Sequence, residues 1–183
     1  PSGGGGAWTL IQTLTSDGSD SDLSFTSGID STYDEYCFKF INLHAETSDA
    51  IFGMNLSIDG GSNYNVTKTS TFYRAYHKED DSTTGLGYDA GYDLAQETVD
   101  QKITMTNKVN NDDGWSGWFQ LFAPSDTTYV KHWLSRISAP YDTSAVDIYT
   151  QGYGNTTSAI DAITFKMSSG EIQGGSISMY GIG

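Results

Sequence analysis

The sequence predicts an all-β protein, a two-sheet antiparallel β-sandwich of jelly-roll type, and three observations favour it. Short runs rich in β-branched and aromatic residues are separated by clusters of Gly, Asn, Asp and Ser. Several runs alternate apolar and polar residues with a period of two, as expected of strands with one buried face. No convincing amphipathic segment exceeds two helical turns. A length of 183 residues suits one such domain.

The chain is expected to consist of a glycine-rich N-terminal arm, residues 1–6, and a single sandwich domain, residues 7–183. The glycines of the arm are Gly3, Gly4, Gly5 and Gly6. A segment without Cβ atoms can lie closely against another chain. We therefore expect the arm to contact a neighbouring subunit, while Ile177, Met179 and Ile182 hold the C-terminus in a sheet.

In the first half of the chain the expected strands are Ala7–Leu14, Leu23–Ile29, Glu35–Leu43, Ala50–Ile58 and Phe72–His77. The fourth run shows the alternation most clearly, with Phe52, Met54, Leu56 and Ile58 on one face and Gly53, Asn55 and Ser57 on the other. Asp59-Gly60-Gly61 then supplies residues that tolerate a positive φ, which predicts a turn.

Residues 78–92 are polar, acidic and glycine-rich, which is typical of a long loop, and Gly91–Asp100 is expected to be one helical turn or irregular. The strands expected after it are Gln101–Val109, Gly117–Ala123, Tyr129–Ile137, Ala145–Tyr149, Ala159–Met167 and Ser176–Ile182. In the first of these, Ile103, Met105 and Val109 alternate with polar residues. The side chains expected to point inward are Phe52, Leu56, Ile103, Phe165 and Ile177.

The charge balance limits the classes of molecule that the protein is expected to bind. The chain has 23 acidic and 9 basic residues, a net charge of -14. Nucleic acid is an unfavourable partner because binding its phosphates requires clustered Lys and Arg. No run of about 20 apolar residues indicates a membrane-spanning helix, so we expect no membrane partner either.

The residues that would support catalysis are sparse. Cys37 is the sole cysteine, lies in an apolar run and cannot form an internal disulfide, so a small buried side chain is expected. A nucleophile would need a histidine base and an acidic partner, and the three histidines, His44, His77 and His132, show no such motif. They could form a zinc site if the fold gathered them. Paired carboxylates could hydrolyse glycosides, although any acidic β-domain offers such pairs. The sequence predicts a non-enzymatic protein.

No cofactor is expected. Calcium binds clustered carboxylate and carbonyl oxygens, and the chain offers three acidic clusters, Asp17/Asp20/Asp22, Glu79/Asp80/Asp81 and Asp112/Asp113. None has the spacing of an EF-hand loop. Structural calcium therefore remains an alternative to solvated turn residues.

Carbohydrate binding, as in a lectin-like β-sandwich module, is the alternative function, and four aromatic residues are its candidates. Trp115 and Trp118 follow an Asn-Asp turn, and Tyr88 and Tyr92 lie in the long polar segment. Exposed rings present an apolar face that suits sugar stacking. The competing interpretation assigns Trp118 and its neighbours to a core strand and leaves Trp115 at the mouth of that strand.

Two stretches of the chain carry a family resemblance. The first is Ala7-Trp8-Thr9-Leu10-Ile11 with Phe25-Thr26-Ser27-Gly28-Ile29, and the second runs from Ala159 to Ile182 and includes Gly175-Ser176-Ile177-Ser178-Met179-Tyr180-Gly181-Ile182. This pattern of strand and turn motifs resembles small β-sandwich virion structural proteins of tailed bacteriophages, particularly marine and cyanobacterial ones.

The resemblance implies a capsid decoration, head-fibre or tail-fibre protein, located on the capsid surface or tail of a virion. It implies assembly with copies of itself, as a homotrimer, and with other virion proteins. Surface glycans would be additional partners of such a protein. The leading hypothesis from sequence is therefore a non-enzymatic virion component.

Overall fold

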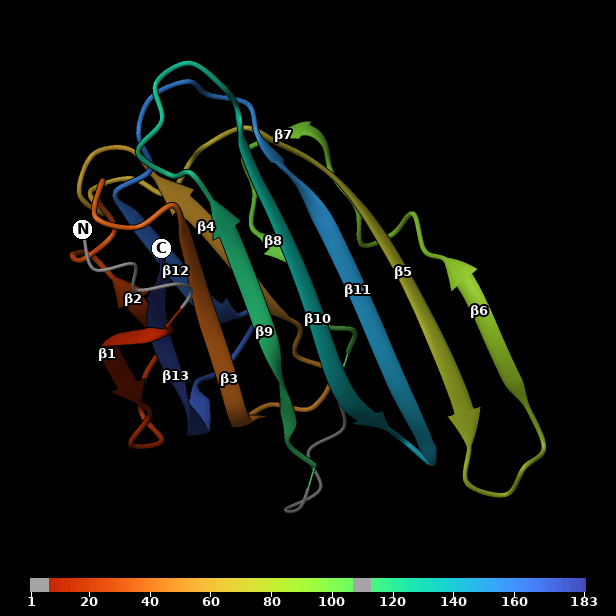
Figure 1. Cartoon of the computed structure of the whole chain (residues 1–183). Helices are drawn as coiled ribbons and strands as arrows, with labels where there is room; N and C mark the ends of the chain where they lie inside the picture. The colour runs from red at the N-terminus through yellow and green to blue at the C-terminus, as the bar shows by residue number, and fades with distance from the viewer. Residues whose placement is uncertain (1–6, 107–112) are drawn as a thin grey trace.

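The computed structural model describes residues 7–106 and 113–183, and these residues form thirteen strands and no helix (Figure 1). The strands make two antiparallel sheets that pack face to face. The expected all-β sandwich is therefore confirmed.

The larger sheet has nine strands. In spatial order they are β1 (Thr9–Thr15), β13 (Ile172–Ile182), β3 (Glu35–Ala45), β9 (Trp115–Phe122), β10 (Lys131–Tyr141), β11 (Ser144–Gly154), β5 (Lys68–Lys78) and β6 (Thr84–Tyr88), with β7 (Ala95–Glu97) also paired to β5. The smaller sheet contains β2 (Asp22–Phe25), β12 (Ala162–Met167), β4 (Phe52–Ser57) and β8 (Gln101–Lys102).

Eight of these strands have jelly-roll topology. The orders β1-β13-β3-β9 and β2-β12-β4-β8 alternate between the two sheets along the chain. Each of the first four of these eight strands, β1 to β4, lies directly beside one of the last four, which are β8, β9, β12 and β13. This nesting is the paired Greek-key arrangement of a jelly roll, as the sequence predicts.

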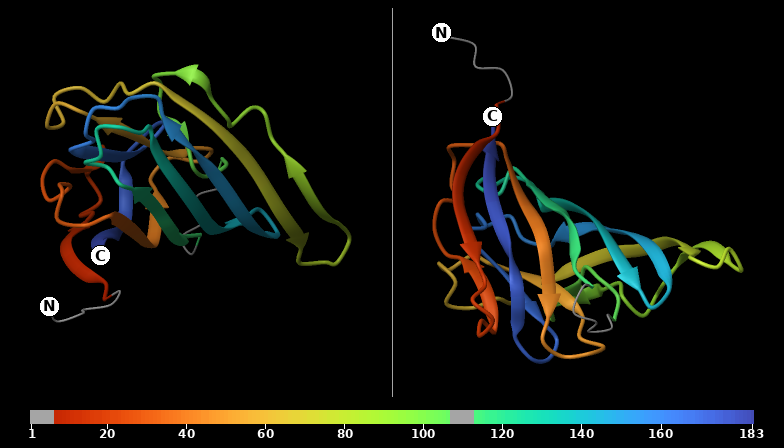
Figure 2. Two further views of the ribbon diagram at one scale, coloured as in Figure 1. Left: turned by 45° about the horizontal axis from the view of Figure 1, so that its top comes forward. Right: turned by 90° about the horizontal axis from the view of Figure 1, so that it is seen from below.

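Two insertions widen one sheet of the jelly roll. The chain between β4 and β8 contributes β5, β6 and β7, and the chain between β9 and β12 contributes β10 and β11. Although they come from separate insertions, β11 and β5 pair along eleven residues. The extended sheet projects beyond the smaller one, with β6 at its outer edge (Figure 2).

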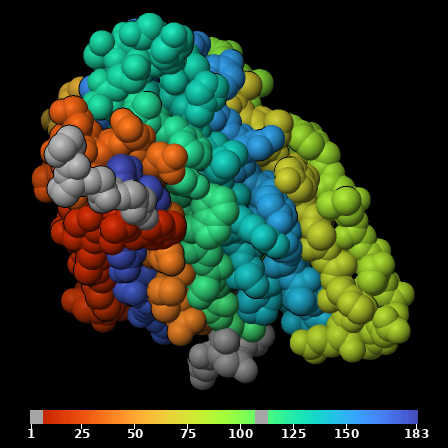
Figure 3. Space-filling view, viewed as in Figure 1, coloured from red at the N-terminus to blue at the C-terminus, as the bar shows by residue number. Residues whose placement is uncertain are grey.

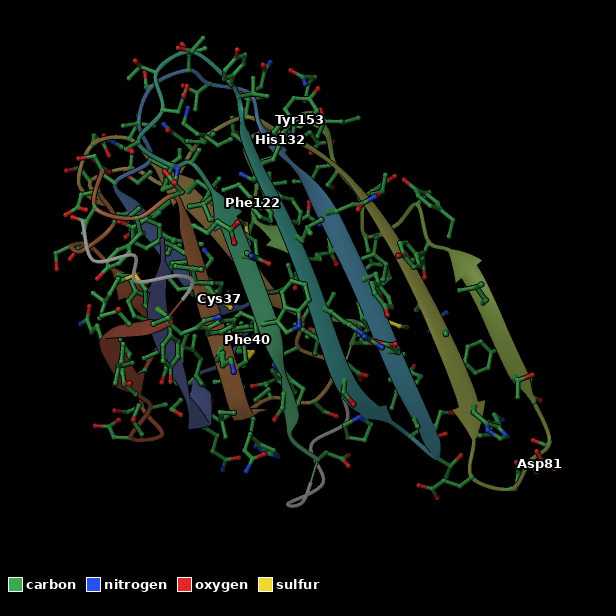
Figure 4. The ribbon with its side chains drawn as sticks, viewed as in Figure 1. Cys37, Phe40, Asp81, Phe122, His132 and Tyr153 are labelled. Carbon is green, nitrogen blue, oxygen red and sulfur yellow. The ribbon has the colours of Figure 1, made fainter. Side chains whose placement is uncertain are left out.

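Aromatic side chains fill the space between the sheets. Phe165 of β12 packs against rings from both sheets, including Phe38 at 5.4 Å and Phe40 at 5.2 Å between ring centroids. The five residues predicted to point inward, Phe52, Leu56, Ile103, Phe165 and Ile177, are all fully buried. Figure 4 shows Phe40 within the sandwich.

The structure corrects several boundaries. The polar segment 78–92 contains β6, and Gly91–Asp100 contains β7 where a helical turn was an alternative. Both segments pair with β5, so a neighbouring strand overrides their weak local preference. Strand β8 contains only Gln101 and Lys102 of the expected strand Gln101–Val109. Thr104, one of the polar residues of that expected strand, is buried and accepts a hydrogen bond from the Phe52 amide.

Further corrections concern single residues. Ile58 lies beyond β4 and is exposed, although the alternation in the sequence placed it on the same buried face as Phe52 and Leu56. The opposite face of β4 is also buried, including Asn55 and Ser57. At the C-terminus β13 holds Ile177 and Met179 in the core, as expected. Residues 1–6, Val109 and Asp112 lie outside the described residues, so the predicted inter-subunit contact of the arm stays a prediction.

Candidate functional site

The outer face of the nine-stranded sheet, which points away from the smaller sheet, is the candidate site. Strand β10 shows how it arises, because its residues alternate strictly between buried and exposed from Lys131 to Ala139. The outward side chains include His132, Leu134 and Arg136. Figure 3 looks onto this face, where β9, β10, β11, β5 and β6 run side by side.

An aromatic row crosses this face from β9 to β6. Register pairs each member with the next: Trp118 with Arg136, Arg136 with Tyr149, Tyr149 with Tyr73, and Tyr73 with Tyr88. Directly opposed residues share one face of a sheet and lie within contact distance. We call Trp118, Arg136, Tyr149, Tyr73 and Tyr88 the aromatic row.

Contacts within the row fix its geometry. The rings of Tyr73 and Tyr149 are parallel to within 4° with centroids 4.9 Å apart, and the Arg136 guanidinium lies 4.8 Å from the Tyr149 centroid. Asp147 accepts two hydrogen bonds from Arg136, at 3.0 Å from Nε and 2.8 Å from Nη2. These hydrogen bonds raise the pKa of Arg136, and their two-point geometry holds the guanidinium beside the Tyr149 ring.

A shallow groove of about 600 Å³ lies on one side of the row. Its floor is made of small residues, including Ala75, Ser138 and Ala145, which leave space beside the larger side chains of the row. Trp118, Arg136 and Asp147 line the edge nearest the row. The groove therefore combines an indole ring with charged and hydroxyl groups.

A second groove, of about 370 Å³, lies on the other side. Its lining comes from β9, β10, β11 and β5, and its outward side chains include Phe122, His132, Leu134, Gln151 and Tyr153. His132 pairs in register with Tyr153, and their rings lie 6.2 Å apart. Figure 4 shows Phe122, His132 and Tyr153 gathered near one end of β9, β10 and β11.

The four predicted aromatic candidates separate into two pairs. Trp118 and Tyr88 lie on the outer face at two ends of one row. Trp115 is buried in the core, and Tyr92 stacks on the buried Phe72 at 4.8 Å. Trp115 and Trp118 are three residues apart in β9, so their side chains face opposite sides of the sheet. Both interpretations of the tryptophans are therefore wrong in part, because Trp115 faces the core and Trp118 faces outward.

Sequence reasoning missed Tyr73, Arg136 and Tyr149. Tyr149 ends the expected strand Ala145–Tyr149, and Tyr153 lies four residues beyond it, so a longer strand would have placed both tyrosines on one face. Nothing in the sequence placed that face beside β5 or β10, because cross-strand register depends on long-range pairing.

The histidines are not gathered into one site. His77 bonds to Asp81, with 2.9 Å between Nε2 and Oδ1, at the far end of the β5–β6 hairpin (Figure 4). His132 lines the second groove, and His44 lies near the end of β3. Within residues 7–106 and 113–183, no three His, Cys, Asp or Glu side chains are placed to hold a metal ion.

Two acidic clusters predicted as calcium alternatives have local partners. The amide and hydroxyl of Ser19 donate to Asp17, and the Asp17 amide donates to Asp20. The Ser82 amide donates to Asp80. Hydrogen bonds of this kind stabilise turns and lower the pKa values of Asp17 and Asp80.

Cys37 lies on β3 and is buried. Desolvation raises the pKa of its thiol to about 11. A thiol is a poor nucleophile and metal ligand unless it ionises, so Cys37 has the properties of a packing residue, as the sequence indicates.

Comparisons with protein families, curated proteins and solved structures gave no match to this chain. In the part of the chain that the structure describes, no helix is long and apolar enough to cross a membrane.

Proposed function

We propose that this protein is a non-enzymatic carbohydrate-binding module whose ligand lies across the outer face of the nine-stranded sheet. The observation that supports the proposal is the aromatic row with a groove on either side. Sugar rings carry apolar C–H faces and a rim of hydroxyls, so they stack on aromatic rings while neighbouring polar groups bind the rim.

The dimensions of the row favour an extended ligand. It crosses five strands spaced about 4.8 Å apart, so its span is roughly 20 Å. A ligand of this length is an oligosaccharide or a polysaccharide segment. Ser138 and Asp147 in the first groove, and Gln151 and His132 in the second, provide hydrogen-bonding groups along both sides.

The small number of carboxylates that line the two grooves supports binding without turnover. Glycoside hydrolysis generally requires two carboxyl groups across the scissile bond. Among the residues that line the two grooves, Asp147 is the one carboxylate, and Arg136 already holds both of its oxygens. We therefore propose that the face binds its ligand unchanged.

Replacing Trp118 with alanine is expected to weaken oligosaccharide binding by about tenfold, because the substitution removes one stacking surface. The measurement is titration calorimetry with soluble oligosaccharides identified from a glycan array. Tyr129→Ala is the matched control, since Tyr129 is 70% exposed but lines neither groove. Equal affinity of both variants and the wild type would exclude the aromatic row as the binding surface.

We propose a virion location as a second assignment, which rests on the family resemblance. The sheet ends in β1 on one side and β6 on the other, and each has one paired neighbour among the described strands. Such edges allow strand addition from another copy, and Leu86 of β6 is 77% exposed. These features support assembly through sheet edges.

An antibody against this chain is expected to label the head or tail of negatively stained phage particles. Deleting residues 1–6 should leave the sandwich folded, as judged by circular dichroism, and reduce incorporation into particles. Unlabelled particles would refute the virion location, and wild-type occupancy of the truncated chain would refute the role of the arm.

A further inference from the structure

Lys68 and Asn55 meet inside the protein, although they belong to different sheets. Lys68 begins β5 in the larger sheet, and Asn55 lies in β4 of the smaller one. Both are buried, and Lys68 Nζ lies 2.6 Å from Asn55 Oδ1. Lys68 Nζ also bonds to the carbonyl oxygen of Val66 at 2.7 Å and approaches that of Thr98 at 3.5 Å.

The hydrogen bonds of Asn55 orient its amide. Oδ1 accepts from Lys68 Nζ and from the Leu56 amide at 2.9 Å. Nδ2 donates to the Thr98 carbonyl and to Asp100 Oδ1, both at 3.0 Å. Since two donors meet the oxygen and two acceptors meet the nitrogen, these partners define the amide orientation.

We propose that Lys68 and Asn55 form an intramolecular isopeptide bond that covalently joins β4 to β5. An amine, a polarised amide carbonyl and a carboxylate beside the leaving nitrogen are the three groups that such an aminolysis needs. No oxidant, reductant or cofactor is required.

The reaction is balanced within these residues. Neutral Lys68 Nζ attacks Asn55 Cγ, which adjoins the oxygen it now contacts, and the new Nζ–Cγ bond moves an electron pair onto Oδ1. The Leu56 amide stabilises the resulting oxyanion. Asp100 takes the proton released by the attacking nitrogen and passes it to Nδ2. The Cγ–Nδ2 bond then breaks, ammonia leaves, and Asp100 is again a carboxylate.

Burial supports the reactivity of the amine. Desolvation lowers the pKa of Lys68 from 10.5 to about 8, although the nearby Asp100 acts in the opposite direction. A desolvated lysine has a larger neutral fraction near neutral pH, and the neutral form is the nucleophile. Lys166 pairs with the other oxygen of Asp100 at 2.8 Å and so holds the carboxylate in position.

A second buried lysine provides a matched comparison. Lys131 of β10 is also fully buried, and desolvation lowers its pKa as well. Its Nζ contacts backbone carbonyls, those of Tyr129 at 2.7 Å and Thr157 at 3.5 Å. Lys131 is therefore buried like Lys68 and, like it, contacts peptide carbonyls. Lys68 differs in that its Nζ also contacts a side-chain amide, that of Asn55.

Mass spectrometry of the denatured full-length chain tests the proposal directly. The purified protein, incubated above about pH 8 to favour the neutral amine, is expected to be lighter than its sequence by one ammonia. Cleavage at Asp59, the sole acidic residue between positions 55 and 68, should leave the two flanking peptides joined. A chain of full sequence mass would refute the bond. Loss of ammonia with the peptides separated would also refute it, because succinimide formation at asparagine gives that result.

Variants assign the roles of the residues. Lys68→Met, Asn55→Ala and Asp100→Asn are each expected to restore the full sequence mass, whereas Lys131→Met should still lose one ammonia. Circular dichroism reports whether each variant folds, and the wild-type measurement stands independently of that outcome. Joined peptides in Lys68→Met would overturn the assignment of the amine, and joined peptides in Asp100→Asn would overturn the role of Asp100.

Discussion

Replacing Phe165 with alanine is expected to lower the free energy of unfolding by about 3–5 kcal/mol, the usual cost of removing a large buried aromatic side chain. Phe165 is fully buried and lies where the two sheets of the jelly roll meet. Its ring centroid is 5.2–6.4 Å from the centroids of Phe25, Phe38, Phe40, Phe52 and Phe119. The truncated side chain would leave a cavity that several rings surround.

Urea denaturation followed by tryptophan fluorescence measures this change. Phe165→Leu is the control, because it keeps most of the volume and should cost less than the alanine variant. A loss below about 1 kcal/mol for Phe165→Ala would show that the two sheets do not pack around this ring.

Replacing Gly117 with alanine is expected to destabilise the fold by about 1–3 kcal/mol, the range for overpacking. A Cβ atom at Gly117 would lie 2.2 Å from the backbone oxygen of Arg136 and 2.8 Å from Ile137 Cα. Backbone atoms cannot move aside as a flexible side chain does, so β9 and β10 must separate. Since Gly117 precedes Trp118 and its Cβ atom would displace the backbone of Arg136, both members of the aromatic row, carbohydrate affinity should fall as well.

Gly87→Ala is the matched control for Gly117→Ala. Gly87 also lies in a strand, and a Cβ atom there would meet no atom within 4 Å, so a change within about 0.5 kcal/mol is expected. Thermal unfolding and calorimetry with the same oligosaccharide compare the two variants. If Gly117→Ala were as stable as Gly87→Ala, the close approach of β9 and β10 would be wrong.

The candidate site could be predicted in part. Exposed aromatic residues near turns are a recognisable signal, and it found Trp118 and Tyr88. It also selected Trp115, which is buried, and Tyr92, which is partly buried against the core, because the presence of an aromatic residue near a turn does not indicate which way its side chain points. Tyr73 and Tyr149 were missed because the local sequence of an amphipathic strand does not show which residue lies opposite a tyrosine on the neighbouring strand.

The amino-acid sequence by itself determined the fold class and most of the core. Period-two alternation identifies a strand and its buried face locally, and Phe52, Leu56 and Ile177 are buried as that alternation predicts. The tertiary structure alone decided how the two insertions join. Paired residues of β5 and β11 are 66 to 86 positions apart along the chain, and strand pairing over that distance depends on the packing of the whole sheet. The same long-range pairing aligns the aromatic row. The contact between Lys68 and Asn55 likewise requires both sheets, because it depends on how one sheet packs on the other.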